Sequence, residues 1–256
     1  MTMTTLAERL DRAIVIHARP HIVFRYFTDT GRWARWWGAG SSIDPRPGGE
    51  MRIRYPDGTE ATGEVIEIVA PTRIVFTYGY ASGAMIPPGG SRVTIRVDPH
   101  EQGTLVALTH EFADAAVRDQ HVQGWRYQLS LFSNVVVDEA LAGAADAVDA
   151  WFAAWATSDE GARRDALARI AAPDVAFRDR YSSIEGIDDL HAHIGAALRF
   201  MPGVRLQRTG GVRQCQGTAL ADWTAAGPEG RAAATGTSVF VFDADARITS
   251  VIGLWN

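Results

Sequence analysis

The sequence predicts an α+β protein built from two domains, and three observations support this class. The chain has 256 residues, which exceeds the usual length of a single domain. In the first half, one strand and a pair of helices precede a run of strands, and a long helix comes last. In the second half the order restarts, with helices first and strands last. Each half is complete as a set of packed layers, so we expect domains over residues 1–142 and 143–256.

Composition limits the classes of partner and site. Hydrophobic residues make up 46% of the chain and charged residues 21%, as in ordinary globular proteins. A formal net charge of -5 provides no positive field for phosphate backbones, so nucleic acid is not an expected partner. Cys215 is the only cysteine, which excludes an intrachain disulfide and four-thiolate zinc sites.

Neither a signal peptide nor a membrane helix is expected. The first eight residues have no basic start and no apolar core. No stretch approaches the roughly 18 apolar residues that a membrane helix needs. We therefore expect a cytoplasmic protein without a membrane partner.

The first domain is expected to open with a strand and a pair of helices. Charged and apolar residues alternate over residues 11–18, which predicts a strand that ends before Pro20. From His21 onward apolar residues recur at helical spacing, with Pro20 at a favoured start position. We expect Gly31 to break the helix, and the second helix to end at a cluster of tryptophans.

The tryptophan cluster consists of Trp33, Trp36 and Trp37. An indole carries a large apolar body with one polar N–H group, so a cluster of this kind is typical of a cavity wall or of the cover over a cleft. The cluster therefore predicts a small-molecule pocket, with Trp36 and Trp37 as ligand contacts. The alternative is that one or two of these side chains serve only as core.

Five strands and a long helix are expected to complete the first domain. Turn signals such as Pro56-Asp-Gly58 and Pro87-Pro-Gly-Gly90 separate the strand candidates, which predicts an antiparallel meander. The predicted strands cover residues 50–55, 59–69, 73–80, 92–98 and 104–112. Residues 114–141 then carry one apolar helical stripe, and this stripe has to be buried across the preceding sheet.

The second domain is expected to place its helices before most of its strands. Apolar spacing predicts helices over residues 146–157, 162–171 and 187–200, with a short strand over residues 175–178 between the second and third helix. Three strands are expected to close the chain. They cover residues 204–225, 232–242 and 248–255, and the first is open to breaks at Gly210-Gly211 and Gly217. Helices followed by a strongly curved sheet indicate an α+β cone-shaped barrel.

The motifs of the first half resemble a known superfamily. In chain order they are Ala18–Phe24, Trp33-Ala-Arg-Trp-Trp37, Pro47–Ile53, Gly63-Glu-Val65, Arg73–Phe76, Thr104–His110 and Gly124-Trp125. This order resembles the START-like (SRPBCC) superfamily, and within it the branch named for homology to the activator of the heat-shock-protein-90 ATPase. The resemblance covers about residues 10–140. It implies a helix-grip fold, in which a curved antiparallel sheet wraps around a long C-terminal helix and leaves a cavity between them.

The motifs of the second half resemble another superfamily. They are Trp151-Phe-Ala-Ala-Trp155, Ala172-Pro-Asp174, Phe177-Arg-Asp179, Gly236-Thr237, Phe242–Asp245 and Gly253-Leu-Trp-Asn256. They look like the SnoaL-like branch of the nuclear-transport-factor-two-like superfamily. That superfamily includes ketosteroid isomerases, polyketide cyclases and dehydratases, so the resemblance predicts the fold more narrowly than the function.

Asp179 is the first catalytic candidate, because the resemblance places it where the isomerase branch carries its proton-shuttling aspartate. A carboxylate at the mouth of an apolar cone could move a proton from carbon beside a carbonyl. The alternative is that Asp179 pairs with Arg178 or Arg180, or caps its own loop. Trp151 and Ser238 stand where the isomerases carry their two oxyanion donors, so steroid isomerisation is disfavoured.

His191 and His193 are further catalytic candidates. Two positions apart on a helix, their side chains diverge by about 200° and cannot chelate one metal ion. We expect one inward and one solvated histidine, and either one could serve as an acid opposite Asp179. The expected ligand contacts of the second pocket are Trp151, Trp155, Tyr181, Trp223 and Ser238.

The first domain has its own set of candidate ligand contacts on the elements that surround a helix-grip cavity. Beside Trp36 and Trp37 they are Tyr78, Tyr80, Met85, His110 and Trp125, with Arg54, Glu64 and Gln128 close by. Each has a structural alternative, since strand tyrosines and a helix tryptophan are also ordinary core residues.

The predicted function is the binding of a small apolar, aromatic or polyketide-like molecule, with or without cofactor-independent cyclisation, isomerisation or dehydration. No nucleophile triad, phosphate loop or metal-ligand cluster occurs in the sequence, so we expect no cofactor and no metal. The alternative is a non-catalytic stress- or chaperone-associated interaction protein. We also expect that the sheet of the second domain can form a homodimer.

Overall fold

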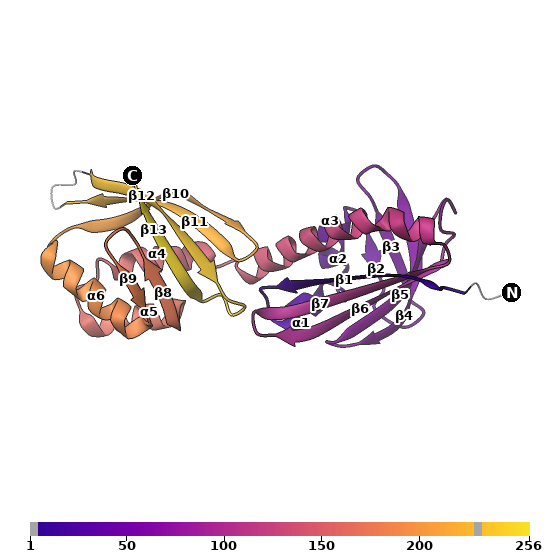
Figure 1. Ribbon diagram of the computed structural model, residues 1–256, viewed down its shortest axis with the longest axis horizontal. Helices are drawn as coiled ribbons and strands as arrows, with labels where there is room; N and C mark the ends of the chain where they lie inside the picture. Colours follow the sequence, from indigo (N-terminus) through magenta and orange to yellow (C-terminus); the bar gives the residue numbers. More distant parts are fainter. Residues whose placement is uncertain (1–4, 228–231) are drawn as a thin grey trace. The chain divides into compact units, whose positions relative to one another are not determined.

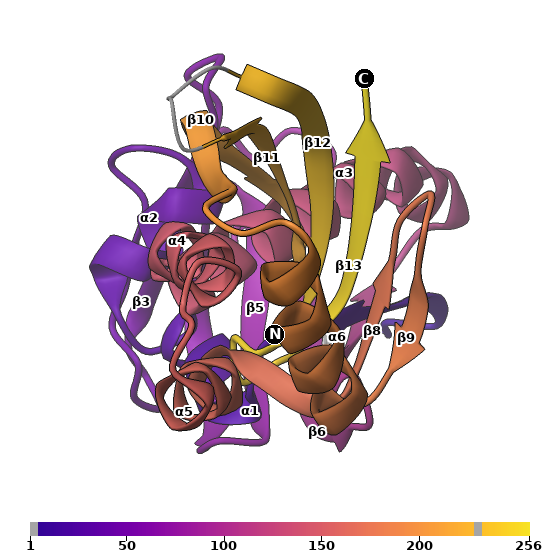
Figure 2. The ribbon, with the colours of Figure 1, turned by 90° about the vertical axis from the view of Figure 1, so that its left-hand side faces the viewer.

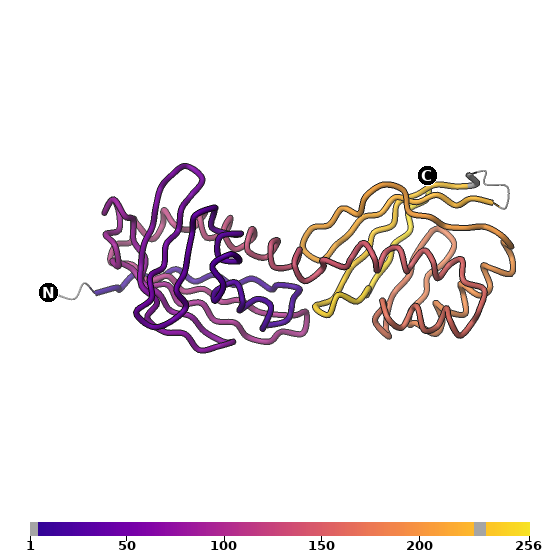
Figure 3. Tube along the Cα trace, turned by 180° about the vertical axis from the view of Figure 1, so that it is seen from behind, coloured from indigo at the N-terminus to yellow at the C-terminus, as the bar shows by residue number. Residues whose placement is uncertain are grey.

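The computed structural model describes residues 5–227 and 232–256. The chain divides into two compact units, Met1–Val137 and Asp138–Asn256. Figure 3 traces the chain through the first unit and then through the second, and each unit contains its own sheet. No helix in the described ranges is long and apolar enough to cross a membrane.

The first unit is built on one antiparallel sheet of seven strands in the order β1-β7-β6-β5-β4-β3-β2 (Figure 1). The strands are β1 (Glu8–Ile16), β2 (Ser42–Ile43), β3 (Glu50–Arg54), β4 (Glu60–Val69), β5 (Arg73–Tyr80), β6 (Ser91–His100) and β7 (Gly103–Phe112). From β2 to β7 each strand pairs with the next one in sequence, so the predicted meander is confirmed. Strand β1 closes the order by pairing with β7.

Two short helices, α1 (Pro20–Arg25) and α2 (Thr30–Trp37), connect β1 to β2. The expectation that Gly31 breaks the helix is wrong, because Gly31 lies in the first turn of α2. The interruption comes earlier, where the Asp29 carboxylate accepts a hydrogen bond of 2.8 Å from the Arg32 backbone N–H. A side-chain cap of this kind starts a new helix, and glycine is tolerated in the first turn that follows it.

Helix α3 (Ala115–Ala140) lies over the sheet of the first unit (Figure 1). Its buried side chains follow the predicted stripe, with Trp125, Leu129, Phe132 and Val136 facing inward. Burial of this stripe between helix and sheet stabilises both, because neither could hide its apolar face alone. The predicted helix-grip arrangement is therefore confirmed.

The second unit combines three helices with a six-stranded sheet in the order β10-β11-β12-β13-β8-β9. The helices are α4 (Ala144–Ala154), α5 (Glu160–Ile170) and α6 (Ile187–Phe200), and they lie side by side in Figure 2. The strands are β8 (Ala171–Arg178), β9 (Ser183–Glu185), β10 (Arg205–Cys215), β11 (Thr218–Ala226), β12 (Ala232–Phe242) and β13 (Ile248–Trp255). The pairing of β13 with β8 is parallel, and the other pairs are antiparallel.

The α+β class is confirmed in this unit, with two corrections. Four strands rather than three close the chain, because the segment over residues 204–225 turns at Gln216 and Gly217, one of the two breaks that the sequence left open. Both residues have positive φ, as a two-residue hairpin turn requires. The glycines Gly210 and Gly211 lie at a bulge inside β10 instead of ending it.

Candidate functional site

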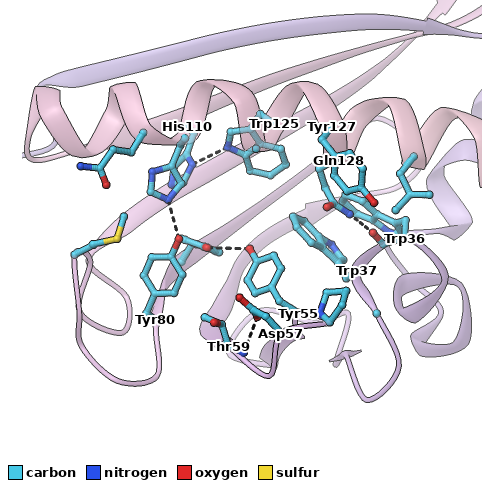
Figure 4. Close-up of a pocket in the computed structure, with 18 of the residues that line it drawn as sticks. Trp36, Trp37, Tyr55, Asp57, Thr59, Tyr80, His110, Trp125, Tyr127 and Gln128 are labelled. Carbon is cyan, nitrogen blue, oxygen red and sulfur yellow. Dashed lines mark hydrogen bonds between the residues drawn. The ribbon is translucent and has the colours of Figure 1, made fainter.

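The first unit contains a cavity of about 870 Å³ under helix α3. Its walls come from α3, from β5 and β7, from the end of α2, and from the loops after β3 and β5. The lining residues are Arg35, Trp36, Trp37, Gly38, Tyr55, Pro56, Asp57, Thr59, Tyr78, Tyr80, Ser82, Ala84, Met85, His110, Gln120, His121, Gly124, Trp125, Tyr127, Gln128 and Leu131. Figure 4 shows Trp125 and Gln128 extending from the helix toward the aromatic side chains below it.

Aromatic rings form most of one wall of this cavity. Trp37 lies 4.3 Å from Trp36 and 5.7 Å from Trp125, measured between ring centroids. The Tyr55 ring meets Trp37 edge-on at 6.1 Å. Such tilted and edge-on arrangements fix the rings in place and make this wall of the cavity apolar.

The wall is held in place by a bond between two helices. The side-chain amide nitrogen of Gln128 on α3 donates a hydrogen bond to the carbonyl oxygen of Trp36 at the end of α2. Beyond Trp37 the chain turns sharply at Gly38, where φ is +127° and a Cβ would lie 2.4 Å from the carbonyl oxygen of Arg54. Only glycine fits this position, so the turn places both tryptophans against the cavity.

His110 is fully buried, and both of its ring nitrogens are already hydrogen-bonded. The indole N–H of Trp125 donates to Nδ1 at 3.0 Å, so the neutral ring carries its proton on Nε2. That Nε2–H faces the hydroxyl of Ser91 at 2.9 Å, and the Ser91 hydroxyl donates to the carbonyl oxygen of Tyr78 at 2.8 Å. Burial, and secondarily the neighbouring His121, lowers the pKa of His110 well below its ordinary value. These bonds hold the His110 ring and the Trp125 indole in a fixed arrangement.

Two tyrosines place neutral hydroxyl groups in the cavity. The hydroxyls of Tyr55 and Tyr78 are 3.0 Å apart, so one donates to the other. Burial raises the pKa of Tyr55 to about 12, and burial raises the pKa of Tyr78 further. Both side chains therefore keep their protons at neutral pH, and the pair retains one O–H donor beyond the bond that it shares.

His121 also lines the cavity, although it is not among the residues expected from the sequence. Its Nδ1 donates to the carbonyl oxygen of Val117 at 2.8 Å, so Nε2 is the unprotonated nitrogen of the neutral ring. The hydroxyl of Tyr80 lies 3.4 Å from this Nε2. Burial lowers the pKa of His121, and the bond to Val117 opposes that shift in part. His121 precedes Trp125 by four residues, and this spacing on a helix was a signal that both face the cavity.

The rim of the cavity carries Met85, which has an unusual backbone conformation, and the acidic residue Asp57. Met85 has a φ of 62°, unusual for a residue with a side chain, and is 53% exposed beside the opening. Asp57 caps its own turn by accepting a hydrogen bond of 2.9 Å from the Thr59 N–H. This backbone bond lowers the pKa of Asp57, so the rim carries a carboxylate at neutral pH.

The predicted catalytic carboxylate, Asp179, lies in the hairpin between β8 and β9 of the second unit. Its carboxylate accepts hydrogen bonds from the Tyr181 backbone N–H at 2.8 Å and from the Trp255 indole N–H at 3.3 Å. It thus caps its own loop, as in the alternative that the sequence left open. The adjoining hollow has a volume of about 350 Å³ and is lined by Arg178, Asp179, Arg180, Ile252, Gly253, Leu254 and Trp255.

The predicted histidines of α6 bond to Glu160 and to Ser182, and Ser182 lies in the same hairpin as Asp179. His191 is buried, and its Nε2 lies 3.0 Å from the carbonyl oxygen of Glu160. His193 is half-buried, with Nε2 3.2 Å from the hydroxyl of Ser182 and its ring against Trp155 and Phe177. His191 is thus the expected inward histidine, whereas His193 is half-buried rather than solvated, because its ring packs against these aromatic side chains.

The other second-domain candidates lie in the packed interior or at the surface. Trp151, Trp223 and Ser238 are buried, and Trp155 is half-buried. Tyr181 is 73% exposed and packs against Trp255 with ring centroids 5.4 Å apart. None of these five residues lines either of the two cavities described above. In the first unit, by contrast, all seven predicted ligand contacts line one cavity, together with Gln128, whereas Arg54 and Glu64 are not among its lining residues.

The fold and the site define a helix-grip protein with an aromatic cavity, joined to an α+β cone. Residues 17–136 match the family model of the activator of Hsp90 ATPase homolog 1-like proteins. Residues 148–251 match the family model of the SnoaL-like domain. The chain therefore consists of an activator-homologue-like domain followed by a SnoaL-like domain.

Solved structures are similar to each half separately. An activator-homologue-like protein from Rhizobium etli is 29% identical, with a TM-score of 0.42, and the match covers 50% of this chain and 81% of that one. A SnoaL-like family protein from Agrobacterium tumefaciens is 26% identical, with a TM-score of 0.42, and the match covers 43% of this chain and 95% of that one. No curated protein matches the chain.

Proposed function

We propose that the protein binds a small apolar, aromatic or polyketide-like molecule in the cavity of its first domain. The observation that carries this proposal is the aromatic cavity of about 870 Å³ under α3. Its volume falls within the range of about 300–1,000 Å³ found for small-molecule sites. Its walls also follow the usual pattern of such sites, because their surface is mostly apolar with a smaller polar part.

The polar groups in this cavity also support cofactor-independent conversion of the ligand. Cyclisation, isomerisation and dehydration all require proton transfer, and an unprotonated imidazole with neutral phenols can supply it. The unprotonated Nε2 of His121 faces the hydroxyl of Tyr80, and both side chains line the cavity. In the second domain, both oxygens of Asp179 accept hydrogen bonds from its own hairpin and from Trp255. We therefore favour the first domain as the place where any such reaction occurs.

A substitution that fills the cavity tests the proposed function. Gly124 lies in α3 among cavity-lining neighbours, and a Cβ placed there meets no atom within 4 Å. A phenylalanine at this position projects into the space that a ligand would occupy, while removal of a helix-interior glycine favours the helix. We expect wild-type protein to bind 2-methoxynaphthalene saturably in equilibrium dialysis. The Gly124→Phe variant should bind it about tenfold more weakly or worse.

The matched control is Gln123→Phe, which adds the same ring to the same helix at an exposed position outside the lining. Its affinity should equal that of the wild type. Unchanged binding in Gly124→Phe would place the aromatic compound elsewhere and contradict the proposal.

A further inference from the structure

The contact between Tyr80 and His121 has a defined direction. Because the carbonyl oxygen of Val117 can only accept, the Nδ1 of His121 must carry the proton in their 2.8 Å bond. The Nε2 of His121 is then an acceptor, and the hydroxyl of Tyr80 is its donor. Both side chains line the cavity, so this donor and this acceptor face the same ligand space.

The geometry of this contact allows a ligand group to replace it. The oxygen and nitrogen atoms are 3.4 Å apart, whereas hydrogen bonds from a hydroxyl group are commonly 2.7–2.8 Å long. The neighbouring polar groups are engaged more closely, with Tyr55 and Tyr78 at 3.0 Å and His110 and Ser91 at 2.9 Å. The contact of Tyr80 with His121 is therefore the longest of these three, and the one that a ligand can replace at least cost.

The chemistry of the pair selects one kind of ligand group. A group that enters between them has to accept a hydrogen bond from Tyr80 and donate one to His121. A hydroxyl does both, whereas a carbonyl or an ether only accepts and would leave the Nε2 of His121 without a donor. Aromatic rings surround the pair, with Tyr78 at 5.7 Å from Tyr80 and at 6.1 Å from His121 between ring centroids. The ligand hydroxyl that suits this setting is one carried by a flat ring, which is a phenol or a cyclic enol.

We propose that Tyr80 and His121 form a recognition site for the hydroxyl group of a phenolic or enolic ligand. The Tyr80 hydroxyl donates to the ligand oxygen, and the ligand hydroxyl donates to Nε2 of His121. This inference rests on the proposed function, since it concerns the same cavity. The lowered pKa of His121 is consistent with it, because the ring stays an acceptor at neutral pH.

Two probes that differ at one group test the recognition site. 2-Naphthol has a hydroxyl group, and 2-methoxynaphthalene keeps the oxygen as an acceptor but has no proton to donate. In equilibrium dialysis with the full chain at pH 7.5, we expect wild-type protein to bind 2-naphthol roughly tenfold more tightly, as one buried hydrogen bond would produce. The ratio of the two affinities should fall to near one in His121→Phe, and it should decrease in Tyr80→Phe.

The ratio separates recognition from general damage to the cavity, because both probes need the same apolar walls. The control variant is His21→Phe, an exposed histidine on α1, which should keep the wild-type ratio. Equal affinity of the two probes for the wild type, or an unchanged ratio in both His121→Phe and Tyr80→Phe, overturns the recognition site alone. Failure of the wild type to bind either probe contradicts the proposed function and this inference together.

Discussion

Replacement of Trp33 with alanine should lower the free energy of unfolding by about 3–5 kcal/mol, the usual cost of removing a buried tryptophan from a core. Trp33 is completely buried, with Trp36 at 5.2 Å and Phe76 at 5.9 Å between ring centroids. Its indole N–H donates to the carbonyl oxygen of Arg52 at 3.2 Å. The substitution therefore opens a void and leaves that oxygen without its indole donor. Urea unfolding of the full chain, followed by near-ultraviolet circular dichroism, measures the loss.

The matched variant for this prediction is Trp33→Phe. It keeps an aromatic ring in the same space and removes only part of the volume and the bond to Arg52, so its cost should be clearly smaller. A loss below about 1 kcal/mol in Trp33→Ala would mean that Trp33 is not the core of the tryptophan cluster.

Acidification should destabilise the first domain before its carboxylates titrate. The folded protein lowers the pKa of both His110 and His121 below 6.5, so the unfolded chain binds more protons as the pH falls. The stability that these groups contribute is complete above about pH 6.5 and is lost as the pH falls toward their folded pKa values. Each histidine should remove about 1.4 kcal/mol per pH unit while only its unfolded form is protonated. Chemical unfolding at several pH values between 7.5 and 5 measures this slope.

The His110→Gln variant tests how much of the loss of stability at low pH comes from His110. A glutamine side chain offers an acceptor and a donor but does not titrate, so the slope below pH 6.5 should decrease by the contribution of one group. The carboxylates with lowered pKa values, such as Asp11 and Glu111, contribute below their ordinary values of 3.8 and 4.5, outside this pH window. An unchanged slope in His110→Gln would show that His110 does not resist protonation.

Much of the fold could be predicted because local signals coincide with its boundaries. The expected strand over residues 73–80 and the expected helix over residues 187–200 coincide with β5 and α6. In both cases a turn signal stands next to the element, Ala70-Pro71 before β5 and Pro202-Gly203 after α6. The break expected at Gly31 failed for a related reason. A glycine in the first turn costs a helix little, and the stronger signal was the capping side chain of Asp29.

The candidate site could be predicted only in part. Strand alternation and helical spacing indicate which face of an element is apolar, and this brought Tyr78, Tyr80 and Trp125 into the expected set. Tyr55 lies next to a turn, so periodicity says nothing about its direction. His121 was overlooked because a polar residue on an apolar stripe resembles a surface position. Its bond to Val117 lies within α3, but its contact with Tyr80 joins the helix to β5 and therefore depends on tertiary structure.

The position of Asp179 shows the limit of reasoning by motif order. The residue occupies the expected hairpin, but its neighbours there are the Tyr181 backbone and the Trp255 indole. Of the two histidines predicted to work with it, His191 bonds to Glu160, and His193 bonds to Ser182 in the same hairpin. Motif order places a residue along the chain, whereas its chemistry depends on the atoms around it.

The most direct test of the central claim, that the ligand binds in the first domain, is nuclear magnetic resonance of the tryptophan indole N–H groups. The chain has eight tryptophans, and three of them, Trp36, Trp37 and Trp125, line the cavity. Titration with 2-methoxynaphthalene should shift these three resonances saturably and leave those of Trp151, Trp155, Trp223 and Trp255 in place. Shifts confined to the four second-domain indoles would contradict the claim.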